Sequence, residues 1–249
     1  MRMILFAKRN TKEVLRDPIN LFFGLGFPLV LMFLLSIINA AIPPEAENPM
    51  FEIYNLAPGL AMFGSVFMAM FVGMLVSKDR GSSFLMRLFT SPMTSLDFLI
   101  GYTLPMFAMT VVQAAITLTA AGVFGLDINI NILLAIVITA MTALFFVGTG
   151  LFFGSFMNDK AVGGICGALL TNVAGWLSGV FIPIDLIGGT FKTVTNILPF
   201  YHIVEVIRAA LSGSFDNILP HLLIVIGYIA VIFALAIIIF QQKMNGEKV

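Results

Sequence analysis

Six long apolar runs, each of about 20 residues and separated by short polar clusters, constrain this chain more than any other feature. An α-helix needs about 20 residues to cross the roughly 30 Å of hydrocarbon in a bilayer, and helices satisfy their own backbone hydrogen bonds there. Hydrophobic residues make up 59% of the chain and charged residues 10%, against about 45–50% and 25% in soluble domains. The sequence therefore predicts an all-α integral membrane protein.

A single transmembrane domain is predicted over residues 18–249, preceded over residues 1–17 by a shorter amphipathic helix. In the shorter segment apolar residues alternate with basic ones at near-helical spacing, which is typical of helices in the cytoplasmic interface of a membrane. Asp17 suits an N-cap and Pro18 a first helical position, and Pro28 predicts a kink in the first span. The six spans are expected at about 19–41, 56–76, 98–123, 130–156, 161–182 and 218–240.

Basic residues are distributed very unevenly between the two sides that these spans define. With both termini placed in the cytoplasm, eleven of the 13 basic residues lie on the cytoplasmic side, and only Lys192 and Arg208 lie outside. Because Lys and Arg favour cytoplasmic loops, this asymmetry sets the orientation. The sequence predicts a multi-pass protein of the plasma (inner) membrane with both termini in the cytoplasm.

Several kinds of chemistry lack the residues that they would need. The sequence has no Gly-x-x-x-x-Gly-Lys-Ser/Thr phosphate loop, and its net charge of zero offers no basic field for nucleic acid. The predicted spans hold no Asp, Glu, Lys or Arg, although ion-coupled carriers and intramembrane hydrolases usually need such groups at membrane depth. The one cysteine, Cys166, lies in an apolar run. We therefore expect membrane lipids as neighbours and no catalytic, cofactor-binding or metal-binding residues.

The fifth span carries small residues at every fourth position. Such a stripe lets a second helix approach closely, and its slow drift around the helix implies a right-handed crossing. Tight packing within one subunit and an interface with a second subunit both fit the pattern. The stripe consists of Gly163, Gly167, Thr171, Gly175 and Gly179.

The connector between the second and third spans, residues 77–97, is far longer than a hairpin requires. Its apolar residues fall on one side of a short predicted helix, while Arg80 and Arg87 can reach water, and Ser91-Pro92 ends the helix. That pattern alone also fits a surface anchor in the lipid that has no protein partner. The apolar side consists of Phe84, Leu85, Leu88 and Phe89.

A second amphipathic helix is predicted on the outer side, between the fifth and sixth spans. His202, Glu205 and Arg208 recur every three residues, with apolar residues opposite, so the helix is expected at the outer surface. Glu205 and Arg208 can pair on one face. His202 beside Glu205 resembles an acid–base pair, but one helix supplies too few convergent groups for catalysis or metal binding. We expect a structural or gating pair, with His221 as a cap at the outer end of the last span.

At these two segments the sequence resembles the permease subunits of type-2 ABC exporters, over nearly the whole chain. The connector matches the family's pattern at Arg80-Gly81-Ser82, Arg87-Leu88 and Thr90-Ser91-Pro92. It departs from the pattern after Gly81, where family members often have an acidic residue and this chain has none. The outer segment matches at Ser178-Gly179, at Pro183, and at Leu198-Pro199 followed by Glu205 and Arg208.

The resemblance implies a fold, partners and site residues. The connector would be a cytoplasmic coupling helix that contacts separate ABC ATPase subunits, and the permease would pair with a second copy or a paralogue. ATP hydrolysis would belong to the partner. The coupling residues would be Arg80, Gly81, Ser82, Arg87, Leu88, Thr90 and Pro92, and the extracellular gate or structural residues Pro183, Pro199, His202, Glu205 and Arg208.

The resemblance favours an ATP-driven exporter, and the uncharged spans favour an amphipathic or apolar cargo, such as a drug, a lipid-like molecule or a glycan-linked one. A scaffold, sensor or immunity protein that transports nothing would have the same hydropathy. A gene for a phosphate-loop ATPase beside this one would favour the exporter.

Overall fold

The structure is a computed structural model that describes residues 2–43, 51–82, 84–85, 88 and 93–246, and the regular secondary structure of these residues is helical. Six helical segments in this described part are long and apolar enough to cross a membrane, which confirms the predicted architecture. The second segment runs farther than predicted, to Gly81, and the fifth ends earlier, at Leu177. The segments are Pro18–Ala41, Ile53–Gly81, Ser95–Phe124, Asn131–Gly154, Asp159–Leu177 and Phe215–Lys243.

The short helix α1 (Arg2–Leu15) precedes the first segment, which is built from three helical pieces. The long helices are α4 (Ile53–Gly81), α6 (Ser95–Ala121), α7 (Asn131–Gly154) and α13 (Phe215–Gly246). The remaining pieces are α2 (Pro18–Leu21), η1 (Phe22–Gly26), α3 (Phe27–Ala41), η4 (Gly122–Phe124), α8 (Asp159–Val162), η5 (Gly163–Leu169), α9 (Leu170–Leu177), α10 (Ile184–Ile187), α11 (Gly189–Ile197) and α12 (Pro199–Ser212).

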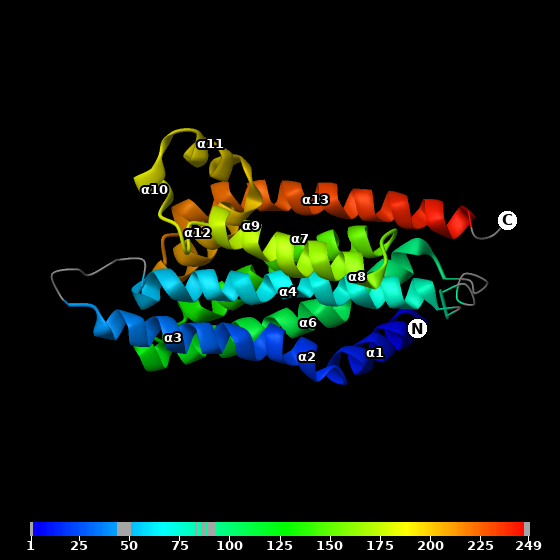
Figure 1. Cartoon of the computed structure of the whole chain (residues 1–249), viewed down its shortest axis with the longest axis horizontal. Helices are drawn as coiled ribbons and strands as arrows, with labels where there is room; N and C mark the ends of the chain where they lie inside the picture. Colours follow the sequence, from blue (N-terminus) through cyan, green and yellow to red (C-terminus); the bar gives the residue numbers. More distant parts are fainter. Residues whose placement is uncertain (1, 44–50, 83, 86–87, 89–92, 247–249) are drawn as a thin grey trace.

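The helices form an elongated bundle with both ends of the chain on one side (Figure 1). We call this side the α1 end and the opposite side, where α10, α11 and α12 lie, the α12 end. Helix α4 is the centre of the bundle. In the apolar stretch that makes it a candidate membrane span, 83% is buried, against 11% in the corresponding stretch of α13. The outward faces of α3 and α13 carry exposed Phe, Leu, Ile and Val side chains, as expected where lipid is the solvent.

Helices α4 and α7 cross with their backbones in contact. A Cβ atom added to Gly154 would lie 2.6 Å from the carbonyl oxygen of Gly73, and one added to Gly150 would overlap the carbonyl oxygen of Ala69. Only glycine permits this approach, and Gly150 and Gly154 have the Gly-x-x-x-Gly spacing of close membrane helix pairs. The crossing lies in the half of the bundle nearer the α1 end, because these glycines belong to the C-terminal parts of both helices.

Two π-helical turns interrupt membrane segments, one just before a proline and the other within a run of small residues. In the first segment η1 (Phe22–Gly26) directly precedes Pro28, so the change of hydrogen-bond pattern falls where the proline ring would crowd the preceding turn. In the fifth, η5 (Gly163–Leu169) falls within the predicted small-residue stripe.

The glycines of the fifth segment differ in which atoms surround them. A Cβ on Gly163 would have no described atom within 4 Å, whereas one on Gly167 would meet the Met70 sulfur at 2.5 Å. Gly175 faces Phe181 and Phe63 side chains. Gly179 follows the end of α9 with a φ of 78°, in the left-handed region that favours glycine.

Helix α12, predicted as an amphipathic helix on the outer side, packs against the bundle with much of its polar side as well as its apolar side. Helices α11 and α12 meet at an angle of 76°, and α12 packs on α13, α7 and α4. His202 on its predicted polar side is buried, like the apolar residues opposite. The amphipathic pattern is present, but its polar members hydrogen-bond to protein groups: His202 to His221 and Asn196, and Arg208 to Glu205, as described below.

Candidate coupling site at the α1 end

Helix α1 lies against α6, with a buried side formed by Phe6, Ala7, Asn10 and Val14. The Phe6 ring meets the Tyr102 ring edge to face, with centroids 4.9 Å apart. Ile4, Leu5 and Leu15 on other sides of the helix remain exposed. The apolar residues of this segment are therefore divided between the bundle and its surroundings.

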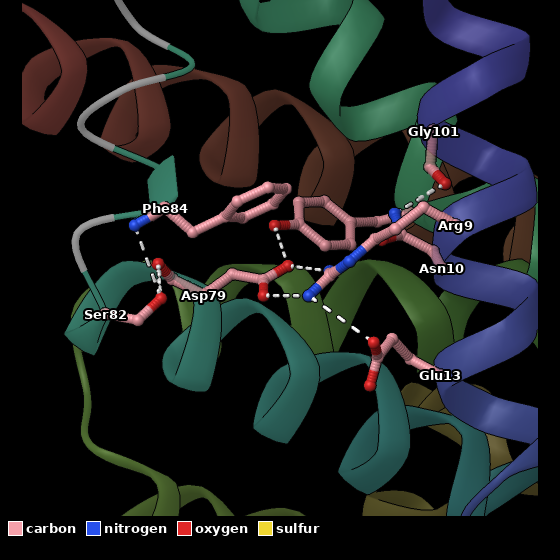
Figure 2. A network of polar contacts seen from close by, with 8 residues as sticks. Arg9, Asn10, Glu13, Asp79, Ser82, Phe84 and Gly101 are labelled. Carbon is pink, nitrogen blue, oxygen red and sulfur yellow. Dashed lines mark hydrogen bonds and ion pairs between the residues drawn. The ribbon is translucent and has the colours of Figure 1, made fainter.

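A bidentate ion pair joins α1 to the end of α4. Arg9 Nη1 and Nη2 donate hydrogen bonds to the two carboxylate oxygens of Asp79, at 2.5 Å and 2.8 Å (Figure 2). The Tyr102 hydroxyl from α6 donates to the same carboxylate at 2.9 Å. Asp79 is only 4% exposed, so these charged and neutral donors take the place of water around its carboxylate.

Further contacts hold Arg9 in place. Its Nη1 also donates to the Asn10 side-chain oxygen at 3.0 Å, and the Asn10 amide donates to the backbone oxygen of Gly101 at 3.0 Å. Glu13 lies one turn away at 3.9 Å. Burial alone would lower the pKa of the Arg9 guanidinium, but the hydrogen bonds and charge of Asp79 outweigh burial and raise that pKa. Arg9 is therefore a permanent cation clamped between three helices.

This network also holds the beginning of the connector. The Arg9 guanidinium carbon lies 4.5 Å from the centre of the Phe84 ring, a cation–π contact. Phe6 stacks on the same ring with centroids 6.4 Å apart, and the Ser82 hydroxyl donates to the backbone oxygen of Asp79 at 3.0 Å. Figure 2 shows the Phe84 ring beside the Arg9–Asp79 pair. The connector thus starts from a point where α1, α4 and α6 are already tied together.

The predicted coupling residues divide into two groups in the structure. Arg80 turns inward, where its Nη2 donates to the backbone oxygen of Met157 just after α7, at 2.6 Å. Gly81 and Ser82 are exposed, and Leu88 is half-buried. Leu85 is buried in the same apolar cluster that Phe84 and Leu88 contact, so these side chains pack on the bundle rather than on lipid. Arg87, Thr90 and Pro92 lie outside the described residues.

The predicted outer residues are held by a different set of bonds. His202 is buried, and its Nε2 donates to the backbone oxygen of Asn196 at 2.8 Å. This tautomer leaves Nδ1 as an acceptor, so the N–H that joins it to His221 Nδ1 at 2.7 Å belongs to His221. The pair ties α12 to α13. Pro199 begins α12 and Pro183 immediately precedes α10, while Arg208 donates to Glu205 on the same helix.

Sequence reasoning missed Asp79, Tyr102 and the pairing of His202 with His221. Asp79 stands between Lys78 and Arg80, where it looks like part of a solvated polar cluster. The one signal was its isolation, because it is the only acidic residue of α4 after the N-terminal turn. Within the described residues no cluster of three or more His, Cys, Asp or Glu side chains could hold a metal ion.

Comparison with known proteins agrees with this architecture. No curated protein matches the chain. The family model for the ABC-2 type transporter matches residues 2–212, which include α1, the first five membrane segments, the connector and α12. Since that match covers most of the 249 residues, the chain belongs to the ABC-2 type transporter family.

Proposed function

We propose that this chain is the permease subunit of an ATP-driven exporter, acting with separate ABC ATPase subunits and with a second permease copy or a paralogue. Membership of the ABC-2 type transporter family supports the role of a membrane transport component. The observation that carries the finer proposal is the convergence of α1, α4, α6 and the connector on Asp79.

The α1 end is assigned to the cytoplasm of the cell, in the plasma (inner) membrane. Most basic residues of the sequence belong to segments at this end, which supports the assignment. The connector then faces the compartment that holds ATP. Helix α1 corresponds to the predicted interfacial segment, residues 1–17. It would lie at the cytoplasmic interface with its exposed Ile4, Leu5 and Leu15 toward lipid.

In the proposed mechanism, closure of the ATPase subunits on ATP moves the connector through Arg80, Gly81, Ser82, Arg87, Leu88, Thr90 and Pro92. Arg9 and Asp79 would prevent the start of the connector from moving independently of α1, α4 and α6, so that a push displaces the helices together. Helix α4 would carry the displacement to α7 through the glycine crossing and to α12 through direct packing. The bundles would then rearrange around a path for cargo.

At the outer end, α12 is proposed as the element that opens. His202 makes its hydrogen bonds to α13 and to Asn196, while Glu205 and Arg208 pair within the helix. Pro183 and Pro199 would set the direction of the chain around it. The absence of Asp, Glu, Lys and Arg from the predicted spans supports an amphipathic or apolar cargo.

The second permease is proposed to lie against the fifth segment. Gly163 has no described neighbour for a Cβ, so a helix from another subunit could approach it closely. Gly167, Gly175 and Gly179 have neighbours in their own subunit, which supports a contact that begins at Gly163 and extends along only part of the stripe.

The test is to purify the tagged chain from its native membranes with its partners and reconstitute the complex. A phosphate-loop ATPase should co-purify, and Arg87→Glu should weaken its binding while Pro92→Ala alters coupling, with Lys12→Glu as a charge-reversal control on α1. Both connector variants should insert normally. If neither they nor a deletion of residues 82–89 changes partner binding or ATP hydrolysis, the coupling assignment is wrong.

A further inference from the structure

A cavity of about 290 Å³ opens beside the corner where α1 gives way to α2. One wall is the end of α1 and the start of α2, and the other is one face of α4. The α4 residues are Phe71, Met74, Leu75 and Lys78, which share a face because they are spaced by three, four and seven. Of its lining residues, Glu13 also contacts Arg9, while Arg9, Asp79 and Tyr102 themselves do not line the cavity.

The polarity of the cavity changes along the direction of the membrane segments. Phe71, Met74 and Leu75 line its inner part, and Lys78 lies in the last turn of the segment Ile53–Gly81. Across from it, Arg16 lies two residues before the first membrane segment begins at Pro18. Two cations thus stand at one membrane boundary with apolar side chains directly below them.

Among the described residues, Arg16 and Lys78 lack the protein partners that other cationic side chains of the bundle have. Arg9 pairs with Asp79, Arg80 with the Met157 carbonyl and Arg208 with Glu205. Within the described part of the chain, no hydrogen bond or ion pair involves the exposed side chains of Arg16 and Lys78.

The carboxylates beside the cavity already have other contacts. Asp17 accepts bonds from the backbone and side chain of Asn20, as the N-cap of α2, and Glu13 lies 3.9 Å from Arg9. In the part of the chain that the structure describes, neither carboxylate forms an ion pair with Arg16 or Lys78.

We propose that this cavity binds a glycerophospholipid, with its phosphodiester between Arg16 and Lys78 and an acyl chain along Phe71, Met74 and Leu75. Glu13 and Asp17 also line the cavity, so the proposal rests on the two cations at the membrane boundary, which suit a lipid phosphate, and on the apolar wall, which lies where the chains would enter the bilayer. The proposal requires only that the chain spans a membrane, so it stands apart from the proposed transport activity. Bound lipid would fill the corner between α1 and α4 and hold α1 at the membrane surface.

The test is native mass spectrometry of the delipidated full chain in detergent, titrated with phosphatidylglycerol. Arg16→Gln and Lys78→Gln should each weaken binding about fivefold and the double variant about thirtyfold, the effect of removing surface cations near a lipid phosphate. Lys12→Gln, an exposed basic residue of α1 that does not line the cavity, should bind as the wild type does.

Two further probes distinguish a lipid from a free anion. Diacylglycerol, which lacks the phosphate, should bind weakly to all variants, and millimolar inorganic phosphate should not displace phosphatidylglycerol. Equal binding by the wild type and the double variant, an equal loss in Lys12→Gln, or displacement by inorganic phosphate would each overturn the proposal. Variants are compared only where their samples are equally monodisperse, so that misfolding is not mistaken for a loss of lipid binding.

Discussion

The two ends of the bundle are held together by different physics. At the α1 end, a charged bidentate pair joins residues 70 positions apart, and glycine backbones of α4 and α7 are in direct contact nearby. At the α12 end, one imidazole hydrogen bond joins α12 to α13, and the described ion pair lies within a single helix. A bidentate ion pair and backbone contacts resist relative movement, whereas a single side-chain hydrogen bond is broken at a smaller cost in free energy. The difference suits the proposal that the α1 end transmits force and the α12 end opens.

The largest loss of stability is expected at the glycine crossing of α4 and α7, in the half of the bundle nearer the α1 end. Gly150→Leu places side-chain atoms where the Ala69 carbonyl lies, so α4 and α7 must separate, and we expect a loss of about 3 kcal/mol or more. Gly227→Leu in α13 is the matched control, because its Cβ meets no described atom within 4 Å. Unfolding in detergent micelles measures both variants. Equal stability would mean that the crossing is not tight.

The next effect should come from the inner ion pair. Asp79→Ala leaves a partly buried Arg9 without its carboxylate, and we expect a loss of about 2–3 kcal/mol, reduced from the fully buried case because Arg9 is 33% exposed. Arg9→Ala combined with Asp79→Ala should cost less than the sum of the single changes. Glu13→Ala, whose contact with Arg9 is 3.9 Å long, is the control. Additive losses would show that the pair is not coupled.

A smaller effect is expected at the outer end. His202→Ala removes the bonds to His221 and to the Asn196 carbonyl, and about 1–2 kcal/mol should be lost. Hydrogen exchange should rise in α11 and α12 but not in α1. If exchange in α1 rises equally, the two ends are not independent and the comparison fails.

The smallest effect is expected for the pair within α12. Arg208→Ala should cost about 0.5 kcal/mol, because a partly exposed pair three residues apart contributes little. Replacing both Glu205 and Arg208 by Gln should have a similarly small effect on unfolding. A loss as large as that of Asp79→Ala would show that the outer end also depends on charge.

Hydropathy was sufficient to predict the six membrane segments, because each needs only a long apolar run. It could not predict Asp79 with Arg9, since local spacing carries no information about residues 70 positions apart. Gly150 and Gly154 have the same spacing as the stripe of the fifth segment, and the sequence did not indicate which helix would be central. His202 looked like a surface residue because a pattern of polar side chains does not distinguish water from buried partners.

The most direct test follows hydrogen exchange in residues 189–212 of the complex with its ATPase, with and without ATP and vanadate. In the wild type, nucleotide should change exchange in this outer segment. In Arg9→Gln the ATPase should remain bound and hydrolyse ATP, but exchange in residues 189–212 should not respond. A response in Arg9→Gln equal to that of the wild type would contradict the proposal that the inner network carries movement from the ATPase to the outer end.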